Sequence, residues 1–281
     1  MNDFITSQLN SYFSSNKDKL NNNYPGIKVQ RLLEEFNYFN LISGLNDSQS
    51  TLKQFAQYLS EGKPLEYISN CAYFFNSRFF VDDSVLIPRS ESEILVEEAI
   101  EFAKRKNISS VLELGVGSGA LLISILQELS FTPSKVVASD ISEKALSIAK
   151  RNFYLHKNKF KPNLVCNFIC SDLFDKINQK FDLIISNPPY IKRLKDRTNV
   201  HKNVLKYEPD VALFLDDEKY FLFFERIFKS IQKHLNIDGL FLMEGHEDHL
   251  EDLKELFSSQ FNVKIIKDYN NKNRFLRISH G

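Results

Sequence analysis

The four residues Asn187-Pro188-Pro189-Tyr190 carry the most specific chemistry in this chain, and they directly follow the apolar run FDLIIS (181–186). The two prolines fix φ and remove two backbone N–H donors, so the carbonyls here point in a set direction. The side-chain oxygen of Asn187 and the carbonyl of Pro188 can then accept both N–H bonds of a planar NH₂ group, and the Tyr190 ring can pack against that group. A bare structural turn is the alternative, but the position at the end of a strand favours a catalytic motif.

A second motif, a run of alternating glycines, follows another apolar strand, VLELG (111–115). Its residues are Glu113, Leu114, Gly115, Val116, Gly117, Ser118 and Gly119. Glycines let the backbone turn tightly and approach a ligand without a Cβ in the way. The spacing G-x-G-x-G differs from the G-x-G-x-x-G of dinucleotide folds, which disfavours an NAD-dependent oxidoreductase, and no P-loop lysine follows. A plain tight turn is the alternative.

Acidic residues stand at the ends of the next two strands. Asp140 ends the run KVVASD (135–140) and could accept both hydroxyls of a ribose; alternatively, it stabilises the N-terminus of the following helix. Asp172, just past LVCNFICS (164–171), could accept from an adenine amino group while Leu173 offers an apolar face to the ring. An Asx turn at Asp172 is the alternative.

The segments that must position these residues alternate between strand and helix from about residue 93 onward. Helical patterns cover 94–105, 120–129, 142–156 and 223–235, and strand patterns cover 111–115, 135–140, 164–171, 181–186 and 239–244. Apolar strands alternating with amphipathic helices predict an α/β fold, a parallel sheet covered on both faces. VKIIKD (263–268) and RFLRIS (274–279) add a terminal pair of strands. Such sheets bind ligands at the carboxyl ends of their strands, where all of these motifs lie.

The first part of the chain has a different pattern. Leu32, Leu33, Phe36, Phe39 and Leu45 have near-helical spacing, as do Leu52, Phe55, Ala56 and Leu59. The runs AYFF and RFFV, within 72–87, predict a hairpin. We therefore expect a helical domain at 1–68 that recognises the substrate, a hairpin linker at 69–90 and a catalytic domain at 91–281.

Composition excludes several classes of protein. The chain has 281 residues, 43% of them hydrophobic, and its 36 basic and 36 acidic side chains cancel, so no global field attracts nucleic acid or an anionic membrane. No apolar run is long enough to span a bilayer, and the start lacks the features of a signal peptide. Cys71, Cys166 and Cys170 have no partner at zinc spacing. We expect reduced thiols, no metal site and a cytoplasmic location.

Together these motifs resemble class I methyltransferases that act on exocyclic or amide nitrogens, and among them the bacterial peptide-chain release factor glutamine methyltransferases. The resemblance covers nearly the whole chain. Its motifs are GKPLEYI (62–68), VLIPRSESEILVE (85–97), VLELGVGSGA (111–120), SNPPYI (186–191), KYEP (206–209), LMEGH (242–246) and DYNNKNR (268–274). The family usually has proline at Ser90, threonine at Val116 and glycine near Asn271, which leaves the shape of the substrate entrance in question.

The resemblance implies a Rossmann-like class I methyltransferase sheet, mostly parallel with an antiparallel terminal strand, and a small helical N-terminal domain. It also implies S-adenosyl-L-methionine as cofactor. Cofactor contacts would come from Glu113, Gly115, Val116, Gly117, Ser118, Gly119, Asp140, Asp172, Leu173 and Asn187. Asn187, Pro188, Pro189 and Tyr190 would be catalytic and bind substrate. Leu86 would line the glutamine pocket near Glu244, although a core position for Leu86 and a buried, hydrogen-bonded acid for Glu244 are equally open. The implied partner is the Gly-Gly-Gln loop of class-1 release factors, bound by a monomer.

Three other functions stay open at this point. A methyltransferase for a glutamine of a ribosomal protein would share these motifs. A nucleic-acid exocyclic-amine methyltransferase could also use Asn-Pro-Pro-Tyr, but it needs a basic face or an added recognition domain to hold a flipped base and track phosphates. A binding module without catalysis would bind cofactor without turnover, and the intact Asn187 and Asp140 argue against it.

Overall fold

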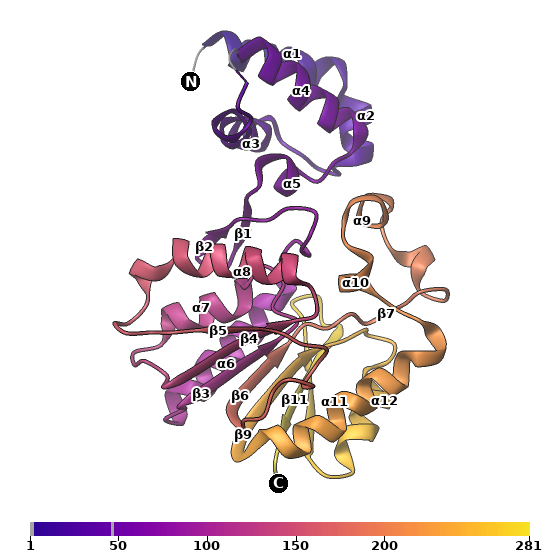
Figure 1. Ribbon diagram of the computed structural model, residues 1–281. Coiled ribbons are helices and arrows are strands. Elements are labelled where there is room, and N and C mark those ends of the chain that lie inside the picture. Colours follow the sequence, from indigo (N-terminus) through magenta and orange to yellow (C-terminus); the bar gives the residue numbers. More distant parts are fainter. Residues whose placement is uncertain (1–2, 46–47) are drawn as a thin grey trace.

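The computed structural model describes residues 3–45 and 48–281 and contains a seven-stranded sheet (Figure 1). Its strands are β3 (Ser110–Leu114), β4 (Lys135–Asp140), β5 (Asn167–Cys170), β6 (Phe181–Ser186), β9 (Leu235–Glu244), β10 (Asn262–Lys267) and β11 (Asn273–Ser279), in the spatial order β10-β11-β9-β6-β3-β4-β5. Five neighbouring strands, β9, β6, β3, β4 and β5, pair in parallel, and β11 is antiparallel to both of its neighbours. The predicted α/β fold with an antiparallel terminal strand is confirmed. The strand order reverses beside β3, which is where open α/β sheets bind ligands.

Helices cover both faces of the sheet. One layer contains α6 (Glu93–Arg105), α7 (Ala120–Glu128) and α8 (Glu143–Leu155), and the other contains α11 (Tyr220–His234) and α12 (Leu250–Ser258). Successive strand residues face opposite layers: Val111 packs with the first layer and Leu112 with the second. This double burial explains why the strands are apolar throughout rather than alternating. Within the described ranges, no helix has the length and apolar character needed to cross a bilayer.

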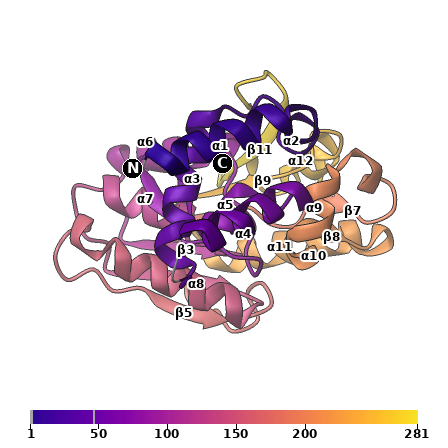
Figure 2. The same cartoon turned by 90° about the horizontal axis from the view of Figure 1, so that it is seen from above.

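The N-terminal helices bury a core of their own above the sheet (Figures 1 and 2). Phe36 and Phe55 meet edge to face in that core, with 5.3 Å between ring centroids. The helices are α1 (Asp3–Ser15), α2 (Lys17–Asn23), α3 (Val29–Ile42), α4 (Ser48–Glu61) and α5 (Leu65–Ser69). The expected hairpin follows them as the antiparallel pair β1 (Ala72–Phe74) and β2 (Ser77–Phe79).

The segment after β6 reaches back to the N-terminal helices. Asn203 Nδ2 donates to the carbonyl of Asn23 at 3.1 Å, and the Tyr207 hydroxyl donates to the carbonyl of Glu61 at 3.0 Å. This segment contains β7 (Ile191–Lys192), α9 (Lys202–Tyr207), α10 (Asp210–Leu213) and β8 (Phe214–Leu215), the two strands pairing in parallel. The sequence analysis assigns no elements here, because none of them is long enough to show a period.

Several boundaries differ from the sequence-based expectations: β9 begins at Leu235 rather than at residue 239, α11 begins at Tyr220 rather than at residue 223, and two further differences leave an apolar residue exposed. Leu45 lies outside the helix that its spacing predicts, because α3 ends at Ile42 and Gly44 turns the backbone with φ 66°. The strand expected from residue 164 begins only at Asn167, and Val165 before it is 69% exposed. An apolar residue type alone did not indicate that Leu45 and Val165 lie at the surface.

Glu35 gives the N-terminal core a pH-dependent stability. Burial raises the pKa of Glu35 to about 7, although a hydrogen bond from Ser69 and the nearby Arg31 oppose the shift. Between its ordinary pKa and about 7, the folded state keeps a proton that the unfolded state has released, so stability falls as pH rises. Glu35→Gln should remove this fall and gain about 1–3 kcal/mol over the wild type at neutral pH. Urea unfolding of both proteins at about pH 5 and about pH 8 measures the free energy of unfolding. An equal change in that free energy between the two pH values in both proteins would contradict this role of Glu35.

Candidate active site

The predicted site residues converge on a cavity of about 350 Å³ at the carboxyl ends of β3, β4 and β6. Of these residues, Leu86, Glu113, Gly115, Val116, Gly117, Ser118, Asp140, Asp172, Leu173, Asn187, Pro188 and Pro189 line it. Gly119 and Tyr190 do not. Tyr190 instead lines an adjoining cavity of about 260 Å³, together with Leu86 and Asn187, which border both spaces.

The glycine loop has the backbone that its sequence requires. Gly115 and Gly117 have φ values of 68° and 51°, and a Cβ added at either would meet open space. Gly119, with φ 81°, precedes α7 as its N-cap, and a Cβ there would come within 3.1 Å of Ile123 Cδ1. Gly115 and Gly117 therefore leave the cavity wall open, and Gly119 permits close packing of α7 against α8.

Asp140 connects this loop to the start of α8. Its Oδ2 accepts from the backbone N–H of Gly117 and its Oδ1 from that of Ser142, both at 2.9 Å. Burial raises the pKa of Asp140, and these N–H donors oppose the shift. Each carboxylate oxygen has two lone pairs and gives one to a backbone N–H, so the carboxylate can still accept from a ligand. Ser142 caps α8, with its Oγ accepting from Ala145 N.

Glu113 and Asp172 are each engaged by the protein itself. The buried Glu113 accepts at Oε2 from the backbone N–H of Leu122 at 3.0 Å, and desolvation raises the pKa of its carboxyl group. Asp172 Oδ2 pairs with Arg226 of α11 at 2.8 Å, a partner that the sequence analysis did not identify. Leu173, beside it, has φ 47°, a strained value for a residue with a branched side chain. That backbone turn brings Asp172 and Leu173 to the cavity.

A buried chain of hydrogen bonds holds Asn187. Its Nδ2 donates to Ser92 Oγ at 3.2 Å, and Ser92 Oγ donates to Glu244 Oε2. The Tyr190 hydroxyl donates to the other oxygen, Glu244 Oε1, at 2.9 Å. Glu244 is 1% exposed, and burial raises its pKa against the two hydrogen bonds and the nearby Arg274.

These hydrogen bonds determine which way the Asn187 amide faces. When the Glu244 carboxylate is ionised it only accepts hydrogen bonds, so the single proton of Ser92 then points at Glu244. In that state Ser92 Oγ can only accept from Asn187, which directs Nδ2 to Ser92 and leaves Oδ1 available to accept from a ligand, on a residue that lines both cavities. The sequence analysis placed Glu244 near the site, but it did not identify Ser92.

Three of the remaining motifs contribute to the wall of the adjoining cavity, through Leu86 and Arg89, His246, and Arg274. Arg89 Nη2 donates to Glu208 Oε1 at 2.6 Å and joins the segment before α6 to the one after α9. Leu86, for which a core position was also open, is half-buried and lines both cavities. Asn271, in the turn where a glycine is expected from the resemblance, has φ 63°, a conformation that asparagine tolerates.

The larger cavity fits the S-adenosyl-L-methionine that the resemblance implies. Asp140 offers free acceptor capacity to ribose hydroxyls. Gly115 and Gly117 leave room for close approach to their backbone, and Leu173 offers an apolar surface to a base. A volume of about 350 Å³ lies in the range of small-molecule sites.

Comparison with known proteins agrees with this site. A family model described as "Methyltransferase small domain" matches residues 90–211. The release factor glutamine methyltransferase of Flavobacterium psychrophilum is 34% identical over 78% of this chain and 72% of its own length. That of Streptococcus pneumoniae is 35% identical over 90% of both chains, and that of Mycoplasma mycoides is 36% identical over 82% of this chain and 80% of its own. The chain belongs to the release factor glutamine methyltransferase family.

Proposed function

We propose that this protein transfers a methyl group from S-adenosyl-L-methionine to the side-chain amide nitrogen of the glutamine in the Gly-Gly-Gln motif of class-1 peptide-chain release factors. The orientation of Asn187 carries the proposal, because Ser92 holds its Nδ2 and the residue lines both cavities, which leaves Oδ1 as the acceptor for a ligand. The larger cavity would hold the cofactor. The smaller one, lined by Leu86 and Tyr190, would receive the glutamine side chain.

The protein has to position a poor nucleophile, because the lone pair of an amide nitrogen is delocalised into its carbonyl. When bound, S-adenosyl-L-methionine supplies a methyl group on an electrophilic sulfonium. Asn187 Oδ1 and the Pro188 carbonyl accept the two amide hydrogens of the substrate and aim its nitrogen at the cofactor cavity. As the new C–N bond forms, the bond between the methyl group and the sulfonium would break and leave a neutral thioether. Positive charge would grow on the nitrogen, so both acceptors would bind the transition state more strongly than the substrate. No strong base is needed before transfer, since the proton becomes acidic only as the bond forms and is then released to water.

Methylation of a purified release factor tests the proposal. Full-length protein is incubated with labelled S-adenosyl-L-methionine and either a release factor or its variant with Gly-Gly-Gln changed to Gly-Gly-Ala, and mass spectrometry locates the label. We expect one methyl group on the Gly-Gly-Gln glutamine and none on the variant. Transfer only to a ribosomal protein or to nucleic acid would support the proposed cofactor but contradict the proposed substrate.

Asp140 should determine cofactor affinity rather than turnover. Asp140→Ala removes a charged acceptor from the cavity, and a hydrogen bond to a charged group contributes about 1.5–3 kcal/mol. We expect the Kd for S-adenosyl-L-methionine to rise by about tenfold to a hundredfold, with a smaller loss of kcat at saturating cofactor. Calorimetry gives the Kd. Asp182→Ala, an acid at the opposite end of the sheet that binds Ser109 and Ser110, is the control for lost stability. An unchanged Kd in Asp140→Ala would show that Asp140 does not bind the cofactor.

We further propose that the helical domain (1–68) and the hairpin linker (69–90) bind the body of the release factor. The contacts of Asn203 and Tyr207 with this domain support the idea, because they join it to the segment that forms the wall of the glutamine cavity. We also propose that the protein acts in the cytoplasm as a monomer and without direct contact to nucleic acid. The balanced charge of the chain favours this over a nucleic-acid methyltransferase.

A further inference from the structure

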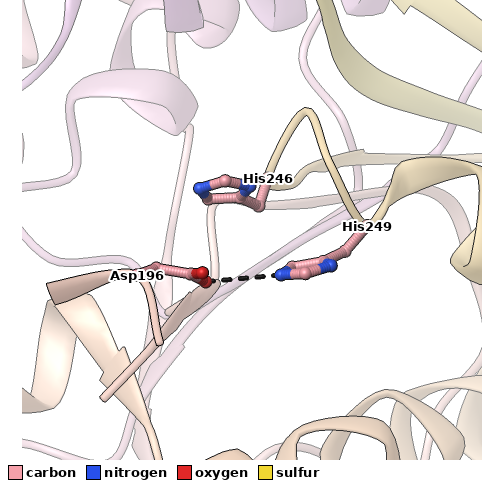
Figure 3. Close-up of side chains that lie close together, drawn as sticks. All are labelled: Asp196, His246 and His249. Carbon is pink, nitrogen blue, oxygen red and sulfur yellow. Dashed lines mark hydrogen bonds and ion pairs between the residues drawn. The ribbon is translucent and has the colours of Figure 1, made fainter. Parts of the chain in front are cut away.

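Three potential metal ligands lie together beside the glutamine cavity (Figure 3). Asp196 follows β7, and His246 and His249 stand in the turn between β9 and α12. One oxygen or nitrogen atom from each residue lies within 4.8 Å of the other two. Both imidazole rings and the carboxylate face a common space in Figure 3. Asp196 and His246 also line the adjoining cavity of about 260 Å³.

The ligand set matches a known class of metal site. Two imidazoles and one carboxylate bind Zn²⁺ at about 2.0–2.2 Å, in sites that keep a fourth position open. Asp196 Oδ2 and His249 Nε2 are 3.3 Å apart. Two ligands bound at those lengths in a tetrahedral arrangement are separated by about the same distance. Because the three ligand atoms lie within 4.8 Å of one another, the third ligand would have to move inward by at most about 1.5 Å to complete the set.

Neighbouring groups already hold two of these ligands in place. Asp196 Oδ2 accepts from the backbone N–H of Lys192 at 3.0 Å, which fixes the carboxylate. His246 Nδ1 accepts from the backbone N–H of Asp248 at 3.3 Å, which holds the ring in the turn after β9. Tyr220 packs against His249, with 5.1 Å between ring centroids. The cluster is therefore partly preorganised.

We propose that Asp196, His246 and His249 form a binding site for a divalent transition-metal ion such as Zn²⁺, with an open coordination position. The ion would join the segment after Asn187-Pro188-Pro189-Tyr190 to the segment after Glu244, and so fix two walls of the glutamine cavity. This site does not depend on the proposed methyl transfer. The sequence analysis predicted no metal site because it considered cysteine spacing, and Asp196 is far from the two histidines along the chain.

Metal binding by the whole protein tests the site. The full chain, without a polyhistidine tag and stripped by a chelator, is titrated with Zn²⁺ by calorimetry and heated with and without the ion. We expect one equivalent of Zn²⁺ per chain and a rise of several degrees in Tm, since an ion that binds only the folded state stabilises it. Co²⁺ should give the visible absorption bands of a tetrahedral N/O site.

Matched variants decide whether these three residues bind the ion. His246→Ala and Asp196→Asn should each weaken Zn²⁺ binding by at least roughly tenfold and abolish the rise in Tm. His201→Asn removes an imidazole elsewhere and keeps a residue that caps α9, so it should behave as wild type. Circular dichroism in the absence of metal shows that each variant folds. No stoichiometric binding by the wild type, or equal binding by His246→Ala and wild type, would overturn the proposal.

Discussion

Replacing Asn187 with alanine is expected to lower kcat by roughly a hundredfold or more. The variant loses one of the two acceptors that hold the substrate amide, while the Pro188 carbonyl remains. Deleting one donor from an oxyanion hole costs about 2.7–4 kcal/mol of transition-state stabilisation, and the same size of effect should apply to an acceptor facing a developing positive charge. Single-turnover methylation of a release factor, measured with saturating cofactor, gives the rate of the chemical step.

The control for Asn187→Ala is cofactor affinity. Asp140 and the glycine loop surround the cofactor cavity, so the Kd for S-adenosyl-L-methionine should change much less than kcat. A variant that loses affinity and rate in equal proportion would show that Asn187 mainly shapes the cofactor site. Normal turnover in Asn187→Ala would refute the proposed mechanism.

The sequence predicted the sheet well because burial on both faces leaves a strong local signal. FDLIIS and KVVASD appear as β6 and β4 with the predicted bounds. The convergence of the motifs also follows from local information, since parallel strands end at one edge. Asp140, Asp172 and Asn187 come from three separate strand ends and line a single cavity.

The surroundings of these residues could not be predicted, because they depend on which distant segments meet. Ser92 lies before α6, and nothing in its local sequence distinguishes it from a surface serine, yet it is 3% exposed and contacts both Asn187 and Glu244. The pairing of Asp172 with Arg226 depends on how α11 packs on its face of the sheet. Short elements such as β7 and α9 give no periodic signal, so the wall that they form was not predicted.

Glu244→Gln is expected to lower kcat by about tenfold to a hundredfold, the range found when residues that orient metal-binding side chains are changed. The glutamine has nearly the same shape as the glutamate, but its NH₂ group can donate to Ser92 Oγ, and the Ser92 proton is then free to point at Asn187. The Asn187 amide would turn its oxygen to Ser92 and its NH₂ group to the cavities, where it faces the NH₂ group of the substrate. Two donors cannot bind each other, so the substrate amide loses its acceptor.

Two comparisons separate this effect from a general loss of structure. Tyr190→Phe removes the other hydrogen bond to Glu244 and keeps both the ring and the contact with Ser92, so it should reduce kcat less than Glu244→Gln. The Tm and the cofactor Kd of Glu244→Gln should stay close to those of the wild type. If Tyr190→Phe were the more damaging variant, the hydroxyl rather than the orientation of Asn187 would control the rate.

The pH dependence of the wild type provides an independent check of the same orientation. Burial raises the pKa of Glu244, and a protonated Glu244 can donate to Ser92 as a glutamine does. The active form is the ionised one, so kcat should fall as pH decreases through this raised pKa. Glu244→Gln has no such group, and its low rate should lack that acidic limb. An acidic limb that persists unchanged in Glu244→Gln would assign the titration to another group and leave the control of Asn187 by Glu244 unsupported.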